Sequence, residues 1–429
     1  MNNGVEGGES YMRVPVVLAL VCVTQVSFSF AAKAAVAPLR IGLAHDYANA
    51  TTVCLTSDKP YVLRDAAGNI IAKGSPSEIY EITDYGQSLV MAHVAGQTPG
   101  HGTVMHDSVT IVPMSGGMSA VVRMDHASKP SWRHYHGYVT VRPDTNSTLS
   151  LVNTVNLEDY LYGVIPAEIG ADVPLEAMKA QAIAARTYAL KNRGRFGAYG
   201  FDIDDTTRSE GYYGVDGETP QSTEAVNDTR GLVLTYGGAL IEASFSTDSG
   251  GVTACDTTGA CPYFQAVHDG PSSDQDYAEN SKTHHWSFTL PQAQLAAVLS
   301  RDSRTSVSTF ASLSIDGYDS SGRITTATVH GTNGEAKSVN GPVLRQVVGY
   351  DRMRSTRVKL TRASDGSYQF TGSGWGHGLG MSQLGAVDMA SAPYNKTCRE
   401  ILSHYYIGAQ LTAVSDASDG NVTVARSVF

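Results

Sequence analysis

The chain is poor in positive charge and in long apolar segments. Its 429 residues carry 31 lysines and arginines against 41 aspartates and glutamates, which gives a formal net charge of −10 at pH 7. The sequence shows no stripe of basic residues, so we do not expect a nucleic acid as partner. It shows no internal repeat, heptad pattern or low-complexity tract either. With 42% hydrophobic residues, the chain instead has the material for a globular protein with a sizeable core.

The one long apolar run lies near the N-terminus. Val14–Phe30 follows Met12-Arg13 and precedes the alanine-rich segment Ala31–Ala35, a pattern typical of a signal peptide with an Ala-x-Ala processing site. Left uncleaved, the run is near the short limit for a membrane-spanning helix. We therefore predict that residues 1–35 are a signal peptide or an N-terminal membrane anchor. Either one makes the rest of the chain extracytoplasmic, secreted or anchored to the outer face of the cytoplasmic membrane.

Cysteine is also scarce, with five in the whole chain. Cys22 lies in the N-terminal apolar run, which leaves an even number in the mature chain. In an oxidising compartment, Cys255 and Cys261 would close a small loop as a disulfide, and this is the state that we favour for them. The other two, Cys54 and Cys398, either pair with each other or stay free.

The hydrophobic patterns predict an α+β fold in which strands dominate. Residues 36–130 contain short alternating runs between Asp, Asn and Gly turns, including a hairpin turn at Asp65–Asn69, so we expect a β-rich N-terminal region. Residues 131–429 mix strands with helices and form the second region. The elements predicted there are one long core helix over residues 174–192 beside an active-site cleft, shorter helices near 291–300 and 381–390, and a hairpin over 313–331.

The long helix and the residues before it supply the first candidate site. Glu168 lies between Pro166 and the helix, in what we expect to be a short connection from which its carboxylate projects into a groove and acquires a raised pKa. Lys179 and Arg186 are seven residues apart on the helix and project in one direction along the border of its apolar stripe. We therefore expect them to line one wall of a cleft. The competing interpretation is that all three are ordinary charges near a helix.

A second candidate segment is Gly372–Ala386, which contains six glycines and is too irregular for a helix or strand interior. Its glycines let the backbone approach a ligand closely. Trp375 offers a stacking face, and His377, Ser382 and Gln383 offer hydrogen bonds, which is the chemistry that holds a sugar ring. The alternative is a tight turn into the next helix, with His377 as an internal hydrogen-bond partner.

Other acidic residues are less suited to chemistry. We expect Glu158 to have a structural role, as a cap or as a partner in an ion pair. Asp202, Asp204 and Asp205 are spaced somewhat like the ligands of a calcium loop, but the required glycine and terminal glutamate are missing. We expect these three aspartates to lie in a solvated loop.

Several ordered motifs of the chain resemble the stage II sporulation protein D family, whose relatives include LytB-like amidase enhancers. The resemblance covers about two thirds of the chain, and ordered motifs of this length are far more specific than a short pattern. The motifs are YHG at 135–137, LVNTVNLEDYLYGVIPAEI at 151–169, LEAMKAQAIAARTYAL at 175–190, FSTDSGG at 245–251, GWGHGLGMSQLGA at 374–386 and EILSHYYIGAQL at 400–411.

The resemblance implies activity on peptidoglycan. Sporulation members of the family are lytic transglycosylases that cut glycan strands stripped of their stem peptides to 1,6-anhydro-N-acetylmuramic ends. Their catalytic glutamate falls at Glu168, and residues important for their activity fall at Lys179 and Arg186. We therefore expect sporulation-linked cell-wall remodelling, with glycan strands as partner. The alternative is a non-catalytic glycan-binding enhancer of a cell-wall amidase, since that branch of the family is described as stimulating a separate enzyme.

The resemblance also bears on the cysteines. Some sporulation members bind zinc with two cysteines and two histidines, for which Cys255 and Cys261 are the candidates in this chain. The family's usual histidine is missing from FSTDSGG, and only residues farther along could replace it, namely His268, His284 or His285. Zinc is therefore less favoured than a disulfide, and we predict no cofactor.

Overall fold

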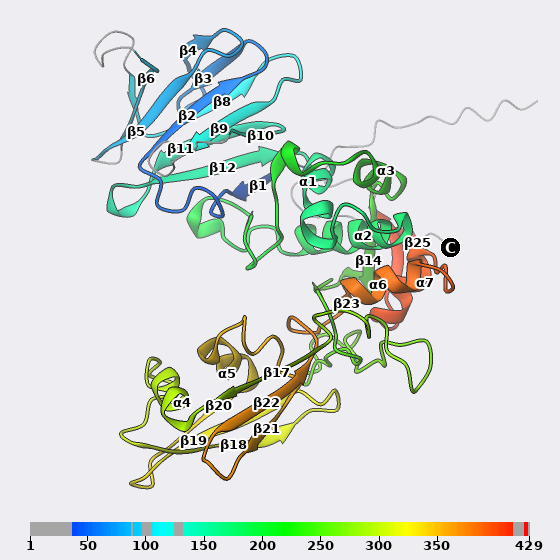
Figure 1. Ribbon diagram of the computed structural model, residues 1–429. Helices are drawn as coiled ribbons and strands as arrows, with labels where there is room; N and C mark the ends of the chain where they lie inside the picture. The colour runs from blue at the N-terminus through cyan, green and yellow to red at the C-terminus, as the bar shows by residue number, and fades with distance from the viewer. Residues whose placement is uncertain (1–36, 87–88, 97–103, 124–131, 415–423, 428–429) are drawn as a thin grey trace, which may run out of the picture. The chain divides into compact units, whose positions relative to one another are not determined.

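A computed structural model describes residues 37–86, 89–96, 104–123, 132–414 and 424–427. The N-terminal segment predicted as a signal peptide or anchor lies outside these residues, as does Cys22. Within the described ranges, none of the helices has the length and hydrophobicity needed to cross a membrane. The elements are mixed α and β with strands in the majority, so the predicted fold class is confirmed (Figure 1).

The N-terminal region consists of two sheets that share one apolar core. The first sheet contains, in spatial order, β13 (Ile203–Asp204), β1 (Leu39–Gly42), β12 (Leu149–Val155), β11 (Tyr138–Pro143), β8 (Val109–Pro113), β3 (Tyr61–Arg64) and β4 (Ile70–Gly74). The second contains β10 (Arg133–Tyr135), β9 (Ser119–Arg123), β2 (Thr52–Ser57), β5 (Tyr80–Gly86), β6 (Leu89–Val94) and β7 (Val104–His106). The strand-rich character expected before residue 130 is confirmed, and the predicted turn Asp65–Asn69 joins β3 to β4.

Both sheets also take strands from beyond residue 130. Strand β12 pairs antiparallel with β1 and leads directly into the first helix, so the sheet supports the segment that carries Glu168. Alternating inward side chains of the two sheets, among them Ile41, Leu63 and Val139 from one and Leu55 and Ile82 from the other, belong to one buried cluster.

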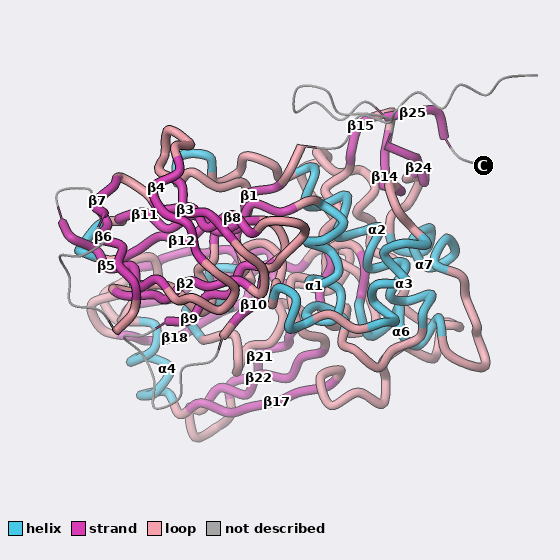
Figure 2. The backbone as a smooth tube through the Cα atoms, turned by 90° about the horizontal axis from the view of Figure 1, so that it is seen from above, coloured by secondary structure: helices cyan, strands magenta, loops and turns pink. Residues whose placement is uncertain are grey.

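Three helices follow: α1 (Leu157–Ile169), α2 (Leu175–Lys191) and α3 (Pro220–Asp228). The long helix predicted over 174–192 is confirmed as α2, with Pro174 at its N-cap position. Residues 177–190 of α2 are all buried except Lys179, because its many alanines let neighbouring helices approach closely. In Figure 2, α2 lies among α1, α3 and the later helices α6 (Gln383–Ala390) and α7 (Cys398–Tyr405), in agreement with its contacts.

The remaining strands near these helices are short. Strand β14 (Leu232–Tyr236) pairs with β15 (Ala239–Leu240) and β24 (Gln410–Val414), and β24 pairs in turn with β25 (Val424–Ser427). Strand β16 (Phe245–Ser246) pairs parallel with β23 (Met381–Ser382). The helix expected near 381–390 is confirmed as α6. Single 3₁₀ turns occur at Thr145–Ser147, Gly197–Tyr199 and Gly214–Gly217.

Residues 285–373 build a subregion with an apolar core of its own. It contains a sheet of β17 (His285–Leu290), β22 (Tyr368–Ser373) and β21 (Val358–Arg362), and a second sheet of β18 (Phe310–Tyr318), β19 (Ile324–Gly331) and β20 (Ala336–Asn340). Two helices, α4 (Gln292–Leu299) and α5 (Gly341–Val348), complete it. The predicted helix near 291–300 and the predicted hairpin over 313–331 are both confirmed.

The prediction of a solvated acidic loop is wrong. Asp202, Asp204 and Asp205 are all at most 5% exposed. Asp202 forms an ion pair with Arg40, and Asp205 accepts the amide hydrogens that follow β1. These carboxylates are buried because strand β13 adds to the edge of the first sheet beside β1.

The favoured disulfide between Cys255 and Cys261 is also absent, and all four described cysteines are free. The Cys255 thiol lies 3.4 Å from the Ser320 hydroxyl, whereas the Cys261 sulfur accepts a hydrogen bond from Tyr263. The two thiols therefore have different partners. Cys54 and Cys398 do not pair either, since Cys54 is buried in β2 and Cys398 begins α7.

Candidate active site

Glu168 lies in the last turn of α1 rather than in a connection between elements. The helix continues through Pro166 and ends at Gly170, whose φ of 95° is a conformation that glycine adopts without a Cβ penalty. The expectation of a loop residue is thus corrected. A helix holds the carboxylate more rigidly than a loop would, which suits a group that must meet a reacting bond in a fixed geometry.

Two donors from distant parts of the chain hold the Glu168 carboxylate. The backbone amide of Gly211 donates to Oε1 at 2.5 Å, and the side-chain amide of Gln383 donates to Oε2 at 3.2 Å. Gln383 is the first residue of α6, so the glycine-rich segment and α1 meet at this carboxylate. The structure thus brings together Glu168 and Gln383, which belong to two separate candidate segments of the sequence.

Burial raises the pKa of Glu168, whereas its hydrogen bonds from Gly211 and Gln383 act in the opposite direction. Within the described residues, Glu168 forms no ion pair, so no direct contact with a cation cancels the effect of burial. A carboxyl group with a raised pKa retains its proton to higher pH and can serve as a general acid.

A second carboxyl group next to the site escaped the sequence analysis. Glu210 is fully buried, and its Oε2 accepts a hydrogen bond from the Tyr160 hydroxyl at 3.2 Å. Burial, reinforced by the negative charge of Glu168, raises the pKa of Glu210 well above its usual range. Both effects favour the protonated form of Glu210. The adjoining residue Gly211 is the amide donor to Glu168, so Glu210 anchors the loop segment that orients the acid.

A cavity of about 780 Å³ opens beside Glu168. Trp375, His377 and Gln383, three of the residues predicted to hold a sugar ring, line it together with Glu168. Ser382 does not line it, because its hydroxyl accepts the Gly385 amide hydrogen as the N-cap of α6. The remaining lining residues are Tyr188, Arg195, Thr207, Arg208, Ser209, Glu242, Ser244, Phe245, Ser246, Thr247, Arg345, Tyr350 and Gly376.

The parallel pairing of β16 with β23 brings the two motif segments of this cavity together. Phe245 pairs with Met381, and Asp248 and Trp375 exchange backbone hydrogen bonds of 3.0 and 2.9 Å. The FSTDSGG segment thus holds the backbone of Trp375 in place through these hydrogen bonds. Both segments have distinctive motifs, but no local pattern in them predicts that they pair.

The glycines at this crossing are required by close packing. Gly376 has a φ of 119°, and a Cβ there would come within 2.5 Å of the Ser246 side chain. Gly378 has a φ of 80°, and a Cβ there would collide with the guanidinium of Arg323. Arg323 in turn donates to the carbonyls of Ser249 and Val252. Here the glycines let backbone segments of the protein pack closely against each other as well as leaving the cavity accessible.

His377 has one ring nitrogen that is already committed. Its Nδ1 accepts the amide hydrogen of Leu379 at 3.0 Å, which leaves Nε2 as the protonated nitrogen of a neutral ring. Desolvation by the surrounding loop and the positive charges of Arg323 and Arg345 lower the pKa of His377. The side chain keeps contact with solvent, and the amide contact at Nδ1 is independent evidence for the neutral form. His377 also has a hydrogen-bond contact with the Phe245 backbone, so contacts with two segments hold its ring in the cavity lining.

Trp375 is the aromatic surface of the cavity. The guanidinium of Arg354 lies 4.9 Å from the centre of its ring, which is a cation–π contact that fixes the ring orientation. Arg195, Arg208 and Arg345 add positive charge to the lining, beside one further carboxylate, Glu242. These arginines come from separate segments, and no sequence pattern marked them as members of one site.

Lys179 and Arg186 lie elsewhere, which corrects the expectation that they form a cleft wall. Arg186 is completely buried, and its guanidinium binds Glu158 through both carboxylate oxygens at 3.0 and 2.7 Å. The expected structural role of Glu158 is therefore confirmed. Lys179 forms surface ion pairs with Glu176 at 3.2 Å and Asp228 at 3.0 Å. Arg186 turns inward because the apolar stripe of α2 is wider than the sequence pattern suggested.

Comparisons with known proteins agree with the motifs of the site. The model of a family described as stage II sporulation protein matches residues 145–236, and that of a domain of unknown function matches residues 260–380. An uncharacterised protein of Brachyspira hyodysenteriae is 32% identical over 284 residues, which is 65% of this chain and 72% of that protein.

Two relatives from Bacillus subtilis carry functional names. Its stage II sporulation protein D is 31% identical over 279 residues, which is 61% of this chain and 76% of that protein. Its amidase enhancer is 31% identical over 293 residues, which is 59% of this chain but only 40% of the longer relative. The chain therefore belongs to the stage II sporulation protein D family.

Proposed function

We propose that the protein is a lytic transglycosylase that cleaves peptide-stripped glycan strands of peptidoglycan to 1,6-anhydro-N-acetylmuramic ends. It would act outside the cytoplasm, in sporulation-linked remodelling of the cell wall. The family and the names of its relatives support a role connected with the cell wall. The observation that carries the enzymatic proposal is the Glu168 carboxyl group, with its raised pKa, on the wall of a 780 Å³ cavity.

A single carboxyl group suits this reaction. A glycoside hydrolase generally needs two, one to protonate the leaving oxygen and one to act as nucleophile or to activate water. In lytic transglycosylation the nucleophile is the C6 hydroxyl of the same N-acetylmuramic acid ring, which the substrate itself holds near the anomeric carbon. The enzyme then needs one group that gives a proton and takes one back.

Glu168 supplies both transfers in the proposed mechanism. Its protonated carboxyl gives a proton to the glycosidic oxygen as the bond from that oxygen to C1 of N-acetylmuramic acid breaks. The resulting carboxylate accepts the proton of the C6 hydroxyl as the C6 oxygen forms a bond to C1. The products are a 1,6-anhydro end and a new hydroxyl on the released sugar. Glu168 ends protonated, and no water is consumed.

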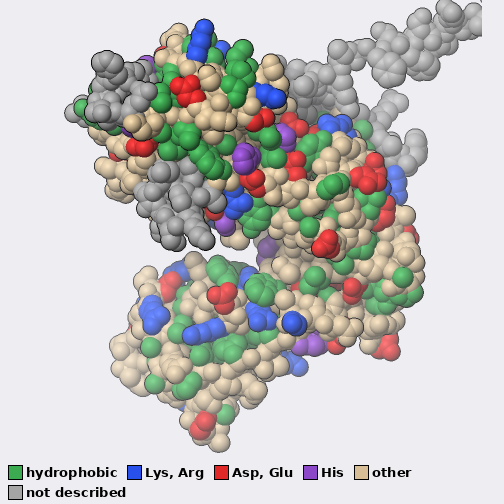
Figure 3. Space-filling view, turned by 45° about the horizontal axis from the view of Figure 1, so that its top comes forward, with side chains coloured by type: hydrophobic (Ala, Val, Ile, Leu, Met, Phe, Trp, Pro, Cys, Tyr) green, Lys and Arg blue, Asp and Glu red, His purple; other side chains and the backbone are tan. Residues whose placement is uncertain are grey.

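The neighbours of Glu168 support each of its two states. Burial favours the protonated acid before bond cleavage, and the hydrogen bonds from Gly211 and Gln383 stabilise the carboxylate that forms during it. Trp375 supplies an apolar surface for a sugar ring, and the polar side chains of His377 and Gln383 belong to the same lining. Acidic and basic side chains are mixed over the face shown in Figure 3. The arginines that line the cavity supply positive charge for the lactyl carboxylates that a peptide-stripped glycan carries.

The first test is product analysis with purified, peptide-stripped glycan strands. We expect the wild-type protein to generate anhydro ends and the Glu168→Gln variant to generate none while keeping its melting temperature. The Glu242→Gln variant tests whether a second carboxylate takes part, because Glu242 is another acidic residue of the cavity lining. Its side chain accepts a hydrogen bond from Asn192. Full activity of Glu168→Gln would remove Glu168 from its role. Abolition of activity by Glu242→Gln as well would indicate hydrolysis through two carboxylates.

A non-catalytic role as enhancer of an amidase is the second candidate, favoured by the name of the B. subtilis relative. It requires glycan binding in the same cavity without bond cleavage. Trp375→Ala should then weaken glycan binding, and Glu168→Gln should leave the stimulation of a cell-wall amidase unchanged. If the Glu168→Gln variant loses both strand cleavage and the stimulation of the amidase, the stimulation depends on the enzymatic activity instead.

A further inference from the structure

A second cluster of reactive side chains lies outside the cavity. Glu279, His284 and His285 each present one ligand atom, and these atoms all lie within 4.8 Å of one another. None of the three lines the cavity beside Glu168. Two imidazoles and a carboxylate are the donor set of many zinc sites that keep a fourth position for another ligand.

The arrangement around His284 is the first argument for a metal. His284 is fully buried, and its Nε2 faces two carboxylate oxygens, Oδ2 of Asp276 at 3.3 Å and Oε2 of Glu279 at 3.5 Å. A ring nitrogen carries at most one hydrogen, so it cannot donate fully to both carboxylates. A cation placed among these atoms satisfies the nitrogen and both oxygens together.

The separations of the ligand atoms are the second argument. Nε2 of His285 lies 3.1 Å from Oε1 of Glu279, and the two distances from His284 Nε2 are 3.3 and 3.5 Å. Zinc bound to nitrogen and oxygen at about 2.0–2.1 Å in a tetrahedron separates its ligand atoms by roughly 3.3–3.4 Å. The contacts of the two histidines with Glu279, to one carboxylate oxygen each, are close to this separation, and all three ligand atoms of the cluster lie within 4.8 Å of one another.

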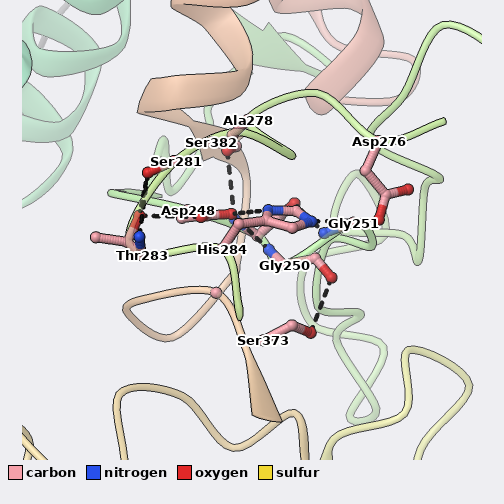
Figure 4. Close-up of polar contacts among 12 residues, drawn as sticks. Asp248, Gly250, Gly251, Asp276, Ala278, Ser281, Thr283, His284, Ser373 and Ser382 are labelled. Carbon is pink, nitrogen blue, oxygen red and sulfur yellow. Dashed lines mark hydrogen bonds and ion pairs between the residues drawn. The ribbon is translucent and has the colours of Figure 1, made fainter. Parts of the chain in front are cut away.

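The other ring nitrogen of His284, Nδ1, contacts a carboxylate, as the second nitrogen of metal-bound histidines usually does. This nitrogen lies 3.2 Å from Oδ1 of Asp248, a carboxylate that is 1% exposed. Asp248 is itself held by the hydroxyl of Thr283 at 3.1 Å and the amide of Gly250 at 2.8 Å, as Figure 4 shows. A carboxylate behind a histidine fixes the ring so that the opposite nitrogen points at the metal.

The position of Asp276 is built into the backbone. Gly251 has a φ of 93°, and a Cβ at this position would collide with the Asp276 carboxylate. In Figure 4, Asp276 lies on the side of His284 opposite Asp248. Asp276 thus has room to provide a fourth ligand only because residue 251 is glycine.

From these contacts we propose that Glu279, His284 and His285 bind one zinc ion, with Asp276 at the fourth position. The site has a structural role in this proposal. His284 accepts the Gly374 amide hydrogen at 2.8 Å through its carbonyl, and Asp248 binds the backbone of Trp375 on both sides. The metal therefore fixes the loop that carries the aromatic wall of the cavity, and it takes no part in cleavage of the glycosidic bond.

The test is zinc binding by the full-length protein, purified without a histidine tag and treated with a chelator. We expect isothermal titration with ZnCl₂ to give one site per chain and the melting temperature to rise with zinc. His285→Ala and Glu279→Gln change exposed residues, so folding should persist, and each should weaken zinc binding at least ~10-fold. The matched controls, His45→Ala and Glu224→Gln, should bind zinc as the wild type does. Absence of zinc binding, or equal binding by the ligand variants, would overturn the proposal.

X-ray absorption at the zinc edge then distinguishes this site from one formed by the free cysteines. The proposal predicts only nitrogen and oxygen ligands, at about 2.0–2.1 Å, whereas a cysteine ligand would add sulfur at about 2.3 Å. Sulfur in the spectrum, or its disappearance in a Cys255→Ser, Cys261→Ser variant, would assign the metal to the cysteines and refute the histidine site. Since neither measurement involves a glycan, a negative result here leaves the transglycosylase proposal untouched.

Discussion

The buried ion pair between Arg186 and Glu158 allows a sharp prediction about a residue that the family resemblance links to activity. The side chain of Arg186 is 0% exposed and that of Glu158 14% exposed. Besides both Glu158 oxygens, the guanidinium binds the carbonyls of Leu232 and Val226, each at 3.2 Å. One arginine thus joins α1 and α2 to the C-terminal half of α3 and to β14.

Arg186→Ala removes these donors and leaves Glu158 buried without its cation. Breaking a buried ion pair from one side typically costs about 3–5 kcal/mol. That is a large share of the roughly 5–15 kcal/mol by which a folded domain is stabilised. Lys179→Ala is the control on the same helix, because Lys179 pairs with partners that are 36% and 48% exposed. Ion pairs of this kind contribute about 1 kcal/mol or less.

Urea unfolding followed by circular dichroism measures both effects, and strand-cleavage assays on the folded fraction give the activity per molecule. We expect Arg186→Ala to lose stability in the stated range while its folded fraction keeps the activity of the wild type. The double variant Arg186→Met, Glu158→Leu should recover much of the loss, since the lone buried charge is gone. An Arg186→Ala protein with wild-type stability and no activity would refute the structural assignment.

Three further predictions concern buried carboxyl groups. Burial raises the pKa of Asp205 to about 7, whereas in the unfolded chain this carboxyl group loses its proton near pH 4. The stability that this group contributes is therefore fully present below pH 4 and is lost as the pH rises to about 7. Asp205→Asn should remove that slope, seen as a difference between the two urea-unfolding curves between pH 4 and 7. Glu210→Gln has the shape of the protonated acid and should change the free energy of unfolding by less than ~1 kcal/mol. Glu210→Ala leaves the Tyr160 hydroxyl without its partner and creates a cavity, so it should lower the free energy of unfolding by about 2–4 kcal/mol in the same measurement. A large effect of Glu210→Gln would mean that this residue is ionised. Gln383→Ala removes a donor that favours the Glu168 carboxylate, so the alkaline limb of the kcat profile should move to higher pH; an unchanged limb would argue that another group sets it.

Local patterns predicted the elements of the site better than their assembly. The proline, the first-turn acid and the alanine spacing located α2 to within a residue at each end, because those signals act within one helical turn. The seven-residue spacing of Lys179 and Arg186 predicted one common direction, but Arg186 is buried whereas Lys179 forms ion pairs at the surface. What faces that direction depends on Glu158, 28 residues away from Arg186, and on α3, and no local pattern contains that information.

Long-range pairing explains the other differences. The sequence predicted a solvated loop for Asp202 and Asp205, because their partners lie in and just after β1, about 160 residues earlier. The cavity arginines and Glu210 were missed for the same reason, since each comes from a different segment and none carries a motif. Glu168, Trp375, His377 and Gln383 were found because each lies in a motif whose composition is unusual by itself.

The most direct test of the central claim is the origin of the oxygen at the new chain end. Peptide-stripped glycan strands are digested with the wild-type protein in water enriched in ¹⁸O, and the new N-acetylmuramic ends are analysed by mass spectrometry. Because the proposed reaction through Glu168 uses the sugar's own C6 hydroxyl, the new ends should be anhydro sugars, lighter by one water and free of ¹⁸O. Reducing ends that carry one ¹⁸O would contradict the account by showing hydrolysis. Intact strands with a folded protein would contradict it in favour of the non-catalytic enhancer.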